Sequence, residues 1–207
     1  GGAGSVRQRG RIFTLSGTHK TTNRVAIDKA LQVRSTIGPG QTVIKGHWDT
    51  STSVWGNGPA AVRGVLMNAN ASLIGFTITN GATTAVGGNN HYDTRGGGIL
   101  VLGSGNVISN CVVTGCTSRN SGGGISANYT GSPAADIHDT IVVGNRSNSN
   151  TGGGCNGANM RYFRCTIIGN HAEGNHGGGG HGGFYFNSLL AGNYASGSGG
   201  GIANGTL

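Results

Sequence analysis

The sequence predicts an all-β protein folded as a single right-handed parallel β-helix, with irregular coils of about 23–35 residues. Three observations predict it: a segment of spaced apolar residues occurs five times, a glycine run follows each copy, and the copies lie 35, 29, 25 and 23 residues apart. A unit of this length with very short strands and no helical period is typical of one solenoid coil. We expect one domain over residues 1–207, with less regular coils and basic loops over 1–70 and glycine-run coils over 71–207.

Each copy runs from one apolar residue to another five positions further on. The copies are Leu73–Ile78, Ile108–Val113, Ile137–Val142, Tyr162–Ile167 and Tyr185–Leu190. Alternation along a strand directs the first and last members inward, and coils that stack at about 4.8 Å place equivalent side chains above one another. The last members therefore predict a core column that includes Val113, Val142, Ile167 and Leu190.

The corners between strands carry their own pattern. Asn145, Asn170 and Asn193 stand three residues after the last member of three successive copies. Asparagine tolerates the left-handed backbone conformation, and its amide can hydrogen-bond along a stack. We therefore expect an asparagine ladder at a tight turn, with these residues in the left-handed conformation. The glycine runs, such as Gly122–Gly124, are expected to supply unusual backbone angles at another corner.

Composition excludes several classes of protein. The chain has 44 glycines and 3 prolines without a Gly-X-Y period, which excludes collagen. Recurrent short apolar runs exclude a disordered chain. The net charge of +8 is compatible with an anionic polysaccharide partner. We expect no nucleic-acid partner, because the cations are not interleaved with aromatic residues, and no membrane span, because no apolar stretch is long enough.

The four cysteines do not form a metal-binding pattern, since the sequence contains no Cys-x-x-Cys. Cys111 and Cys165 belong to one column but are separated by the coil of Thr140. Two rungs are about 9.6 Å apart, which exceeds the Cα separation that a disulfide allows. We therefore predict buried free thiols.

The motifs that carry the repeat also resemble a known family. The Gly-Gly-Gly-Ile runs, Asn110-Cys111-Val112-Val113 and the segment 73–81 resemble the right-handed β-helix repeats of the pectate-lyase-like superfamily, especially the glycine-run repeat proteins of bacterial surfaces and secretions. Phe184-x-x-Asn187 is more weakly similar to repeats of chlamydial polymorphic outer-membrane proteins. The resemblance covers roughly residues 22–207 and implies the fold and an extracellular or cell-surface location. It does not define a function, because the superfamily contains lyases, hydrolases, adhesins and fibres.

The supply of carboxylates bears on catalysis. Lyases of the superfamily often hold Ca²⁺ with several carboxylates, and glycoside hydrolases need a carboxyl pair. The acids of this chain are scattered, without Asp-x-Asp or Asp-Asp: Asp28, Asp49, Asp93, Asp136, Asp139 and Glu173. We expect no cofactor.

The best catalytic cluster is His91, Tyr92, Asp93 and Arg95, in the segment 83–95 that lengthens one coil. A lyase without a metal could use Tyr or His as base and acid, with Arg neutralising a uronate carboxylate. The alternative is a polar loop that covers the coil below it.

Two further groups of residues are candidates for binding. His171, His176 and His181 are spaced by five and could bind zinc or copper. Alternatively, His181 lies at the edge of the core, in the column of Ile99. Trp48 and Trp55 lie in a polar loop, where they could stack on a sugar ring or cap an apolar edge.

The ends of the chain carry no amphipathic helix that would cap a solenoid. We expect either a fragment of a longer repeat protein or subunits that associate head to tail. The leading hypothesis is a non-catalytic, extracellular structural or adhesive β-helix, with a stacked fibre as one form. The alternative is a polysaccharide lyase that acts on an anionic glycan in a groove along the coils. An ice-binding face is disfavoured, because only Thr77-x-Thr79 provides a Thr-x-Thr pair.

Overall fold

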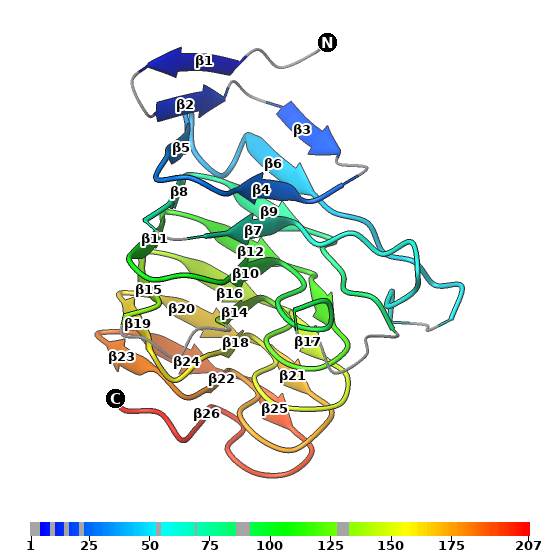
Figure 1. Cartoon of the computed structure of the whole chain (residues 1–207). Helices are drawn as coiled ribbons and strands as arrows, with labels where there is room; N and C mark the ends of the chain where they lie inside the picture. Colours follow the sequence, from blue (N-terminus) through cyan, green and yellow to red (C-terminus); the bar gives the residue numbers. More distant parts are fainter. Residues whose placement is uncertain are drawn as a thin grey trace.

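The computed structural model describes residues 5–8, 11–14, 17–20, 23–52, 55–68, 70–85, 92–127 and 133–207. These residues form strands and turns arranged as a parallel β-helix, without a helix among them. Figure 1 shows the coils stacked along one axis from the amino-terminal to the carboxyl-terminal end. In the part of the chain that is described, no helix is therefore available to cross a membrane.

Three long sheets form the walls of the β-helix, and each coil adds a strand to each wall. Sheet A comprises β1 (Ser5–Gln8), β2 (Arg11–Thr14), β5 (Gln32–Ser35), β8 (Ser72–Ile74), β11 (Asn106–Ser109), β15 (Ala135–His138), β19 (Met160–Phe163) and β23 (Phe184–Phe186). Sheet B comprises β3 (Gly17–Lys20), β6 (Thr42–Lys45), β9 (Thr77–Thr79), β12 (Val112–Thr114), β16 (Ile141–Val143), β20 (Thr166–Ile168) and β24 (Leu189–Ala191). Sheet C comprises β4 (Val25–Ile27), β7 (Val65–Met67), β10 (Ile99–Val101), β14 (Ile125–Ala127), β18 (Cys155–Asn156), β22 (Gly180–His181) and β26 (Ile202–Ala203).

A short fourth sheet accompanies only the later coils. Sheet D comprises β13 (Thr117–Ser118), β17 (Arg146–Ser147), β21 (His171–Ala172) and β25 (Tyr194–Ala195). Strands β1 and β2 pair antiparallel, whereas the pairs further along sheet A and those of sheets B, C and D are parallel. Each sheet therefore grows by one strand per coil, as the repeat predicts.

The predicted core columns are confirmed by the strand register. In sheet A, Leu73 pairs with Ile108, which pairs with Ile137, and the column continues through Tyr162 and Tyr185. In sheet B, the column runs from Ile78 through Val113, Val142 and Ile167 to Leu190. All of these side chains are buried except Leu190, which is partly buried against the core. The core therefore lies between the walls as continuous columns of side chains.

The asparagine ladder is confirmed, but its predicted backbone conformation is wrong. The Asn145 amide donates to the Asn170 side-chain oxygen at 3.0 Å, and the Asn170 amide donates to that of Asn193 at 3.0 Å. The left-handed residue is instead the preceding glycine, with φ of 63° at Gly144 and 62° at Gly169. The asparagine side chains turn inward to reach main-chain carbonyls, so the sharp turn falls one residue earlier.

The glycine runs supply the predicted unusual backbone angle, but only at the first glycine of each run, as at Gly152 and Gly177, with φ of 68° and 70°. The register of the fourth run requires a correction. The fourth run begins at Gly177, so His181 pairs with Asn156 and not with the column of Ile99. Gly180 occupies that column, where an added Cβ would lie 2.0 Å from the Tyr185 hydroxyl oxygen. The large Tyr185 side chain fills the space that an isoleucine occupies in other coils.

The prediction for the cysteines is confirmed. Cys111, Cys116, Cys155 and Cys165 are buried and unpaired. Burial raises the pKa of the Cys111 thiol to about 11 and that of Cys155 to about 12. At neutral pH these thiols are protonated and serve as small core residues.

Candidate functional site

Among the cavities that the described residues line, two lie next to side loops of the β-helix. The larger, which we call the loop cavity, has a volume of about 730 Å³ and is lined by Tyr92, Arg95, Ser121, Thr151, Asn156 and His181 among others. The smaller, which we call the tryptophan cavity, has a volume of about 200 Å³ and is lined by Trp48, Trp55, Asn145, Arg146, Gly169 and His171 among others. The first adjoins sheet C and the second adjoins sheet D.

A buried arginine holds the loop that forms one side of the loop cavity. The Arg63 guanidinium donates hydrogen bonds to the main-chain oxygens of Tyr92, Arg95 and Gly96, at 2.8 Å for the last two. Burial lowers the pKa of Arg63 to about 10, which still leaves it charged at neutral pH. Arg63 was not predicted as a site residue. The sequence feature that could have identified it is its position as a single cation within the apolar run from Ala60 to Met67.

The structure brings together part of the predicted catalytic cluster. Tyr92 and Arg95 both line the loop cavity, whereas Asp93 is exposed and is not among the lining residues. His91 lies outside the described residues. Burial lowers the pKa of Arg95. The cavity therefore combines one phenol and one cation of the predicted set.

His181 contributes an imidazole to the loop cavity from β22. Its ring nitrogens lie 3.4 Å and 3.1 Å from the side-chain nitrogens of Asn156 and Asn204. Asn156 also donates to the Thr151 hydroxyl at 2.9 Å. These contacts fix the ring at the edge of sheet C, so His181 serves the cavity and not the core column.

The predicted histidine metal site does not form. His171 lines the tryptophan cavity, His181 lines the loop cavity, and His176 bonds to Ser198 at 2.8 Å. Within the described part of the chain, no three His, Cys, Asp or Glu side chains are placed to hold a metal ion. A spacing of five residues distributes the histidines around one coil instead of along one face.

The tryptophan cavity is closed by the loop 46–62, the cyan segment that follows β6 in Figure 1. His47 and Val62 pair across the base of the loop, at 3.0 Å and 2.9 Å. Asp49 accepts hydrogen bonds from the main-chain nitrogens of Ser51 and Ala60, and these bonds lower its pKa. The described parts of the loop, 46–52 and 55–62, thus form a hairpin-like excursion.

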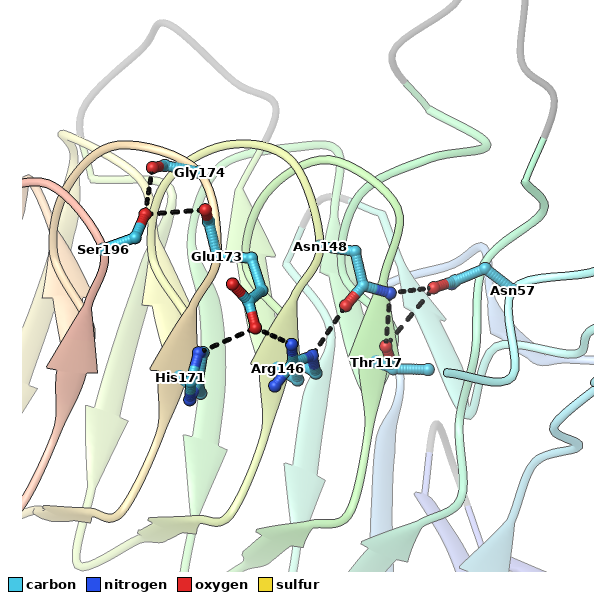
Figure 2. Close-up of polar contacts among 8 residues, drawn as sticks. All are labelled: Asn57, Thr117, Arg146, Asn148, His171, Glu173, Gly174 and Ser196. Atoms are coloured by element: carbon cyan, nitrogen blue, oxygen red, sulfur yellow. Dashed lines mark hydrogen bonds and ion pairs between the residues drawn. The ribbon is translucent and has the colours of Figure 1, made fainter. Parts of the chain in front are cut away.

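Asn57 anchors this loop to sheet D. It is fully buried, and its amide donates to the Thr83 main-chain oxygen at 3.0 Å. Its side-chain oxygen accepts from Thr117 at 3.4 Å and from Asn148, as Figure 2 shows. The loop therefore crosses from an early coil to later ones and places both tryptophans over sheet D.

A polar group beside the tryptophans spans two coils, and we call it the Arg146 network (Arg146, Asn148, His171 and Glu173; Figure 2). The Arg146 guanidinium lies 3.6 Å from the Trp55 ring centroid and forms an ion pair with Glu173. The His171 Nε2 lies 3.1 Å from the same carboxylate. Burial, followed by the charge of Arg146, lowers the pKa of His171.

Most of the carboxylates form ion pairs or hydrogen bonds with other groups of the protein. Asp136 forms a bidentate pair with Arg161 at 2.6 and 2.7 Å, and Asp139 forms one with Arg164 at 2.7 and 2.9 Å. Both pairs join adjacent coils of sheet A, or of the turn that follows it. The contact with Arg164 lowers the pKa of Asp139. The scattered acids of the sequence therefore connect rungs.

The fold and its side loops define the class of protein: a parallel β-helix with loop-bounded cavities along its flank. Residues 24–195 match the model of the family described as "Protein of unknown function (DUF1565)", and the chain belongs to this family. No curated protein and no solved structure matches the chain. The resemblance to a particular repeat type of the pectate-lyase-like superfamily stays a prediction.

We expect acidification to destabilise the chain in part through His181. Burial and the nearby His176 lower the pKa of folded His181 below its ordinary value of 6.5. The unfolded chain therefore takes up a proton first as the pH falls. The contribution of His181 to the free energy of unfolding is complete above pH 6.5 and is lost as the pH falls through the lowered pKa.

This effect can be measured as the dependence of Tm on pH, from about pH 8 to about pH 5. The variant His181→Gln, which cannot titrate, should lose less stability on acidification than the wild type. A remaining dependence is expected in the variant, because the pKa of His171 is lowered too. Identical pH profiles of the two proteins would contradict the assignment.

Proposed function

We propose that this chain is a non-catalytic structural or adhesive β-helix that works outside the cytoplasm, at the cell surface or beyond it. The observation that carries the proposal is the use of the carboxylates. Four of the six acids, Asp49, Asp136, Asp139 and Glu173, are bound within the fold. The other two, Asp28 and Asp93, are exposed and line neither cavity. A hydrolytic pair of carboxyl groups across a substrate is therefore not supplied.

The outer faces of the sheets support an adhesive role. On sheet A, the rings of His138, Phe163 and Phe186 stack with centroids 4.8 and 5.0 Å apart. On sheet B, Ile141 and Leu189 are 42 % and 56 % exposed. Exposed apolar side chains repeated along a rigid surface are typical of contact with a partner.

The carboxyl-terminal coil supports head-to-tail association. Strands β24 and β25 stand at the edges of sheets B and D. An edge strand can pair with a strand of another subunit, and β3 stands at the opposite edge of sheet B. We propose that subunits stack in this way, so that the last coil of one continues into the first coil of the next.

Electron microscopy and sedimentation velocity test the association. We expect filaments, or a sedimentation coefficient that rises with protein concentration. Leu190→Lys should suppress this growth by placing a charge at the end of the core column. The matched control Ile141→Lys changes an exposed residue of the outer face and should leave growth unchanged. A monodisperse monomer at high concentration would contradict the fibre.

A polysaccharide lyase is the second candidate, because Tyr92, Arg95 and His181 face one cavity. Arg95 could neutralise a uronate carboxylate while the Tyr92 phenolate or the His181 imidazole removes the adjacent C5 proton. The C4–O bond then breaks to leave a C4=C5 double bond, and the other of these two groups, in its protonated form, gives a proton to the leaving oxygen. Ultraviolet absorbance of unsaturated products, during incubation with uronate polysaccharides, tests this. Absorbance that grows with the wild type and not with Arg95→Ala would replace the non-catalytic proposal.

A further inference from the structure

We propose that the tryptophan cavity binds one ring of a neutral saccharide, with the C–H face of the sugar against the two tryptophans and its hydroxyls against the Arg146 network. This inference rests on the adhesive part of the proposed function and names its ligand class. It concerns sheet D, and is independent of the loop cavity that a lyase would use.

The aromatic part of the site is held in place before any ligand binds. Trp48 packs on Gly56, where an added Cβ would lie 2.6 Å from the indole Cγ. Asn57 fixes the loop through buried hydrogen bonds to Thr83 and to Thr117 of sheet D. The Trp48 and Trp55 side chains nevertheless remain 37 % and 45 % exposed. The Arg146 guanidinium packs on the Trp55 ring, and both tryptophans stay partly exposed at the cavity. Aromatic residues held in this way are suited to binding, because little conformational entropy is lost.

The floor of the cavity leaves room for a small ring. Gly144 and Gly169 line it at successive coils, and a Cβ added to either would meet no atom within 4 Å. The volume of about 200 Å³ is below the roughly 300–1,000 Å³ typical of sites for drug-sized ligands. The cavity therefore fits one sugar ring and leaves a longer chain to extend along the surface.

The polar part of the site matches hydroxyl groups. Arg146 offers N–H donors and Glu173 offers acceptor oxygens, while the imidazole of His171 can do either. The Glu173 side chain is 40 % exposed and His171 33 % exposed, so both can reach a ligand. A hydroxyl donates and accepts at once, and so can satisfy both kinds of group.

The charges favour a neutral ligand. The positive charge of Arg146 is paired with the negative charge of Glu173. Burial and Arg146 lower the pKa of His171 below 6.5, so it is uncharged at neutral pH. The network therefore carries no net charge, although the whole chain carries +8. A uronate would meet the Glu173 carboxylate, and Arg146 is already paired with that carboxylate.

The chain reports on this site by its own fluorescence, because its two tryptophans both line the cavity. We expect a saturable change in tryptophan emission on titration with at least one of gluco-, galacto-, manno- or xylo-oligosaccharides. Binding should be the same in low and high salt, since screening weakens only charged ligands. Uronate oligosaccharides serve as the charged comparison.

Calorimetry with the active oligosaccharide then assigns the site. Trp55→Ala should weaken binding by about tenfold or more, because aromatic contacts dominate such sites. Trp55→Phe should restore part of the affinity and guards against a folding defect. The control Phe184→Ala changes an exposed aromatic residue on sheet A and should bind as the wild type does.

Three results would overturn the proposal: no emission change or heat with any neutral oligosaccharide, equal binding by Trp55→Ala, or binding only of uronates with loss in high salt. None of them affects the filament measurements, which test the structural role separately. If Trp55→Ala still binds the oligosaccharide, the protein binds glycans at a site outside the tryptophan cavity.

Discussion

Replacing Asn170 with alanine should lower the free energy of unfolding by about 3–5 kcal/mol, because each orphaned buried polar group costs about 1–3 kcal/mol. The side-chain oxygen of Asn170 accepts from the main-chain and side-chain nitrogens of Asn145, both at 3.0 Å. Its amide donates to the Val142 main-chain oxygen at 2.9 Å. Asn170 is 1 % exposed, so water cannot replace these bonds. The variant breaks the ladder between three coils at once.

Asn193→Ala is the matched control, since Asn193 is the last member of the same ladder and is only partly buried. This substitution should lower the free energy of unfolding by about 1–2 kcal/mol, because water can hydrogen-bond to some of the groups that lose Asn193 as a partner. Urea unfolding followed by far-ultraviolet circular dichroism measures both. Equal costs for the two variants would mean that the ladder does not connect the coils cooperatively.

The repeat made the core of this fold predictable from the sequence. Alternation along a strand assigns the inward face, and the recurrence of apolar pairs assigns which residues share a column. Val113, Val142 and Ile167 were therefore placed correctly without any knowledge of the turns. The asparagine ladder was also predictable, because a polar residue repeated at a corner needs partners in adjacent coils.

The register of a glycine run could not be predicted from the same pattern. Four consecutive glycines, Gly177–Gly180, fit the pattern in two registers, and without side chains neither register is favoured by burial. The choice depends on Tyr185, whose hydroxyl occupies the space above Gly180. That contact is made between different walls of one coil and has no period in the sequence, so His181 was assigned to the wrong column.

The cavities were harder to predict than the core, because their residues come from different coils. Trp55 and Arg146 are far apart in the sequence and meet only because the loop 46–62 crosses the later coils. The two tryptophans were predicted as ligand-binding candidates from their residue type. Their partners depend on the buried anchor Asn57, which nothing in the sequence distinguishes from the many exposed asparagines.

The second large effect is expected at Tyr162, the most voluminous of the fully buried side chains. Its ring stacks on Tyr185 with centroids 4.6 Å apart and an interplanar angle of 3°. Tyr162→Ala should lower the free energy of unfolding by about 3–5 kcal/mol, because the cavity lies within a narrow core whose rigid strands cannot collapse into it. Thermal and urea unfolding measure the loss.

Two controls separate packing from other causes. Tyr162→Phe keeps the ring and removes only a hydroxyl that contacts the Met160 sulfur at 3.6 Å, so its cost should stay within about 1 kcal/mol. Phe163→Ala removes the next ring along β19, which points outward between His138 and Phe186 and should cost about 1 kcal/mol. A shift of β19 by one residue would exchange these two faces. If Phe163→Ala lowers the free energy of unfolding more than Tyr162→Ala does, Phe163 and not Tyr162 lies in the core. That result would contradict the register on which every column of this β-helix depends.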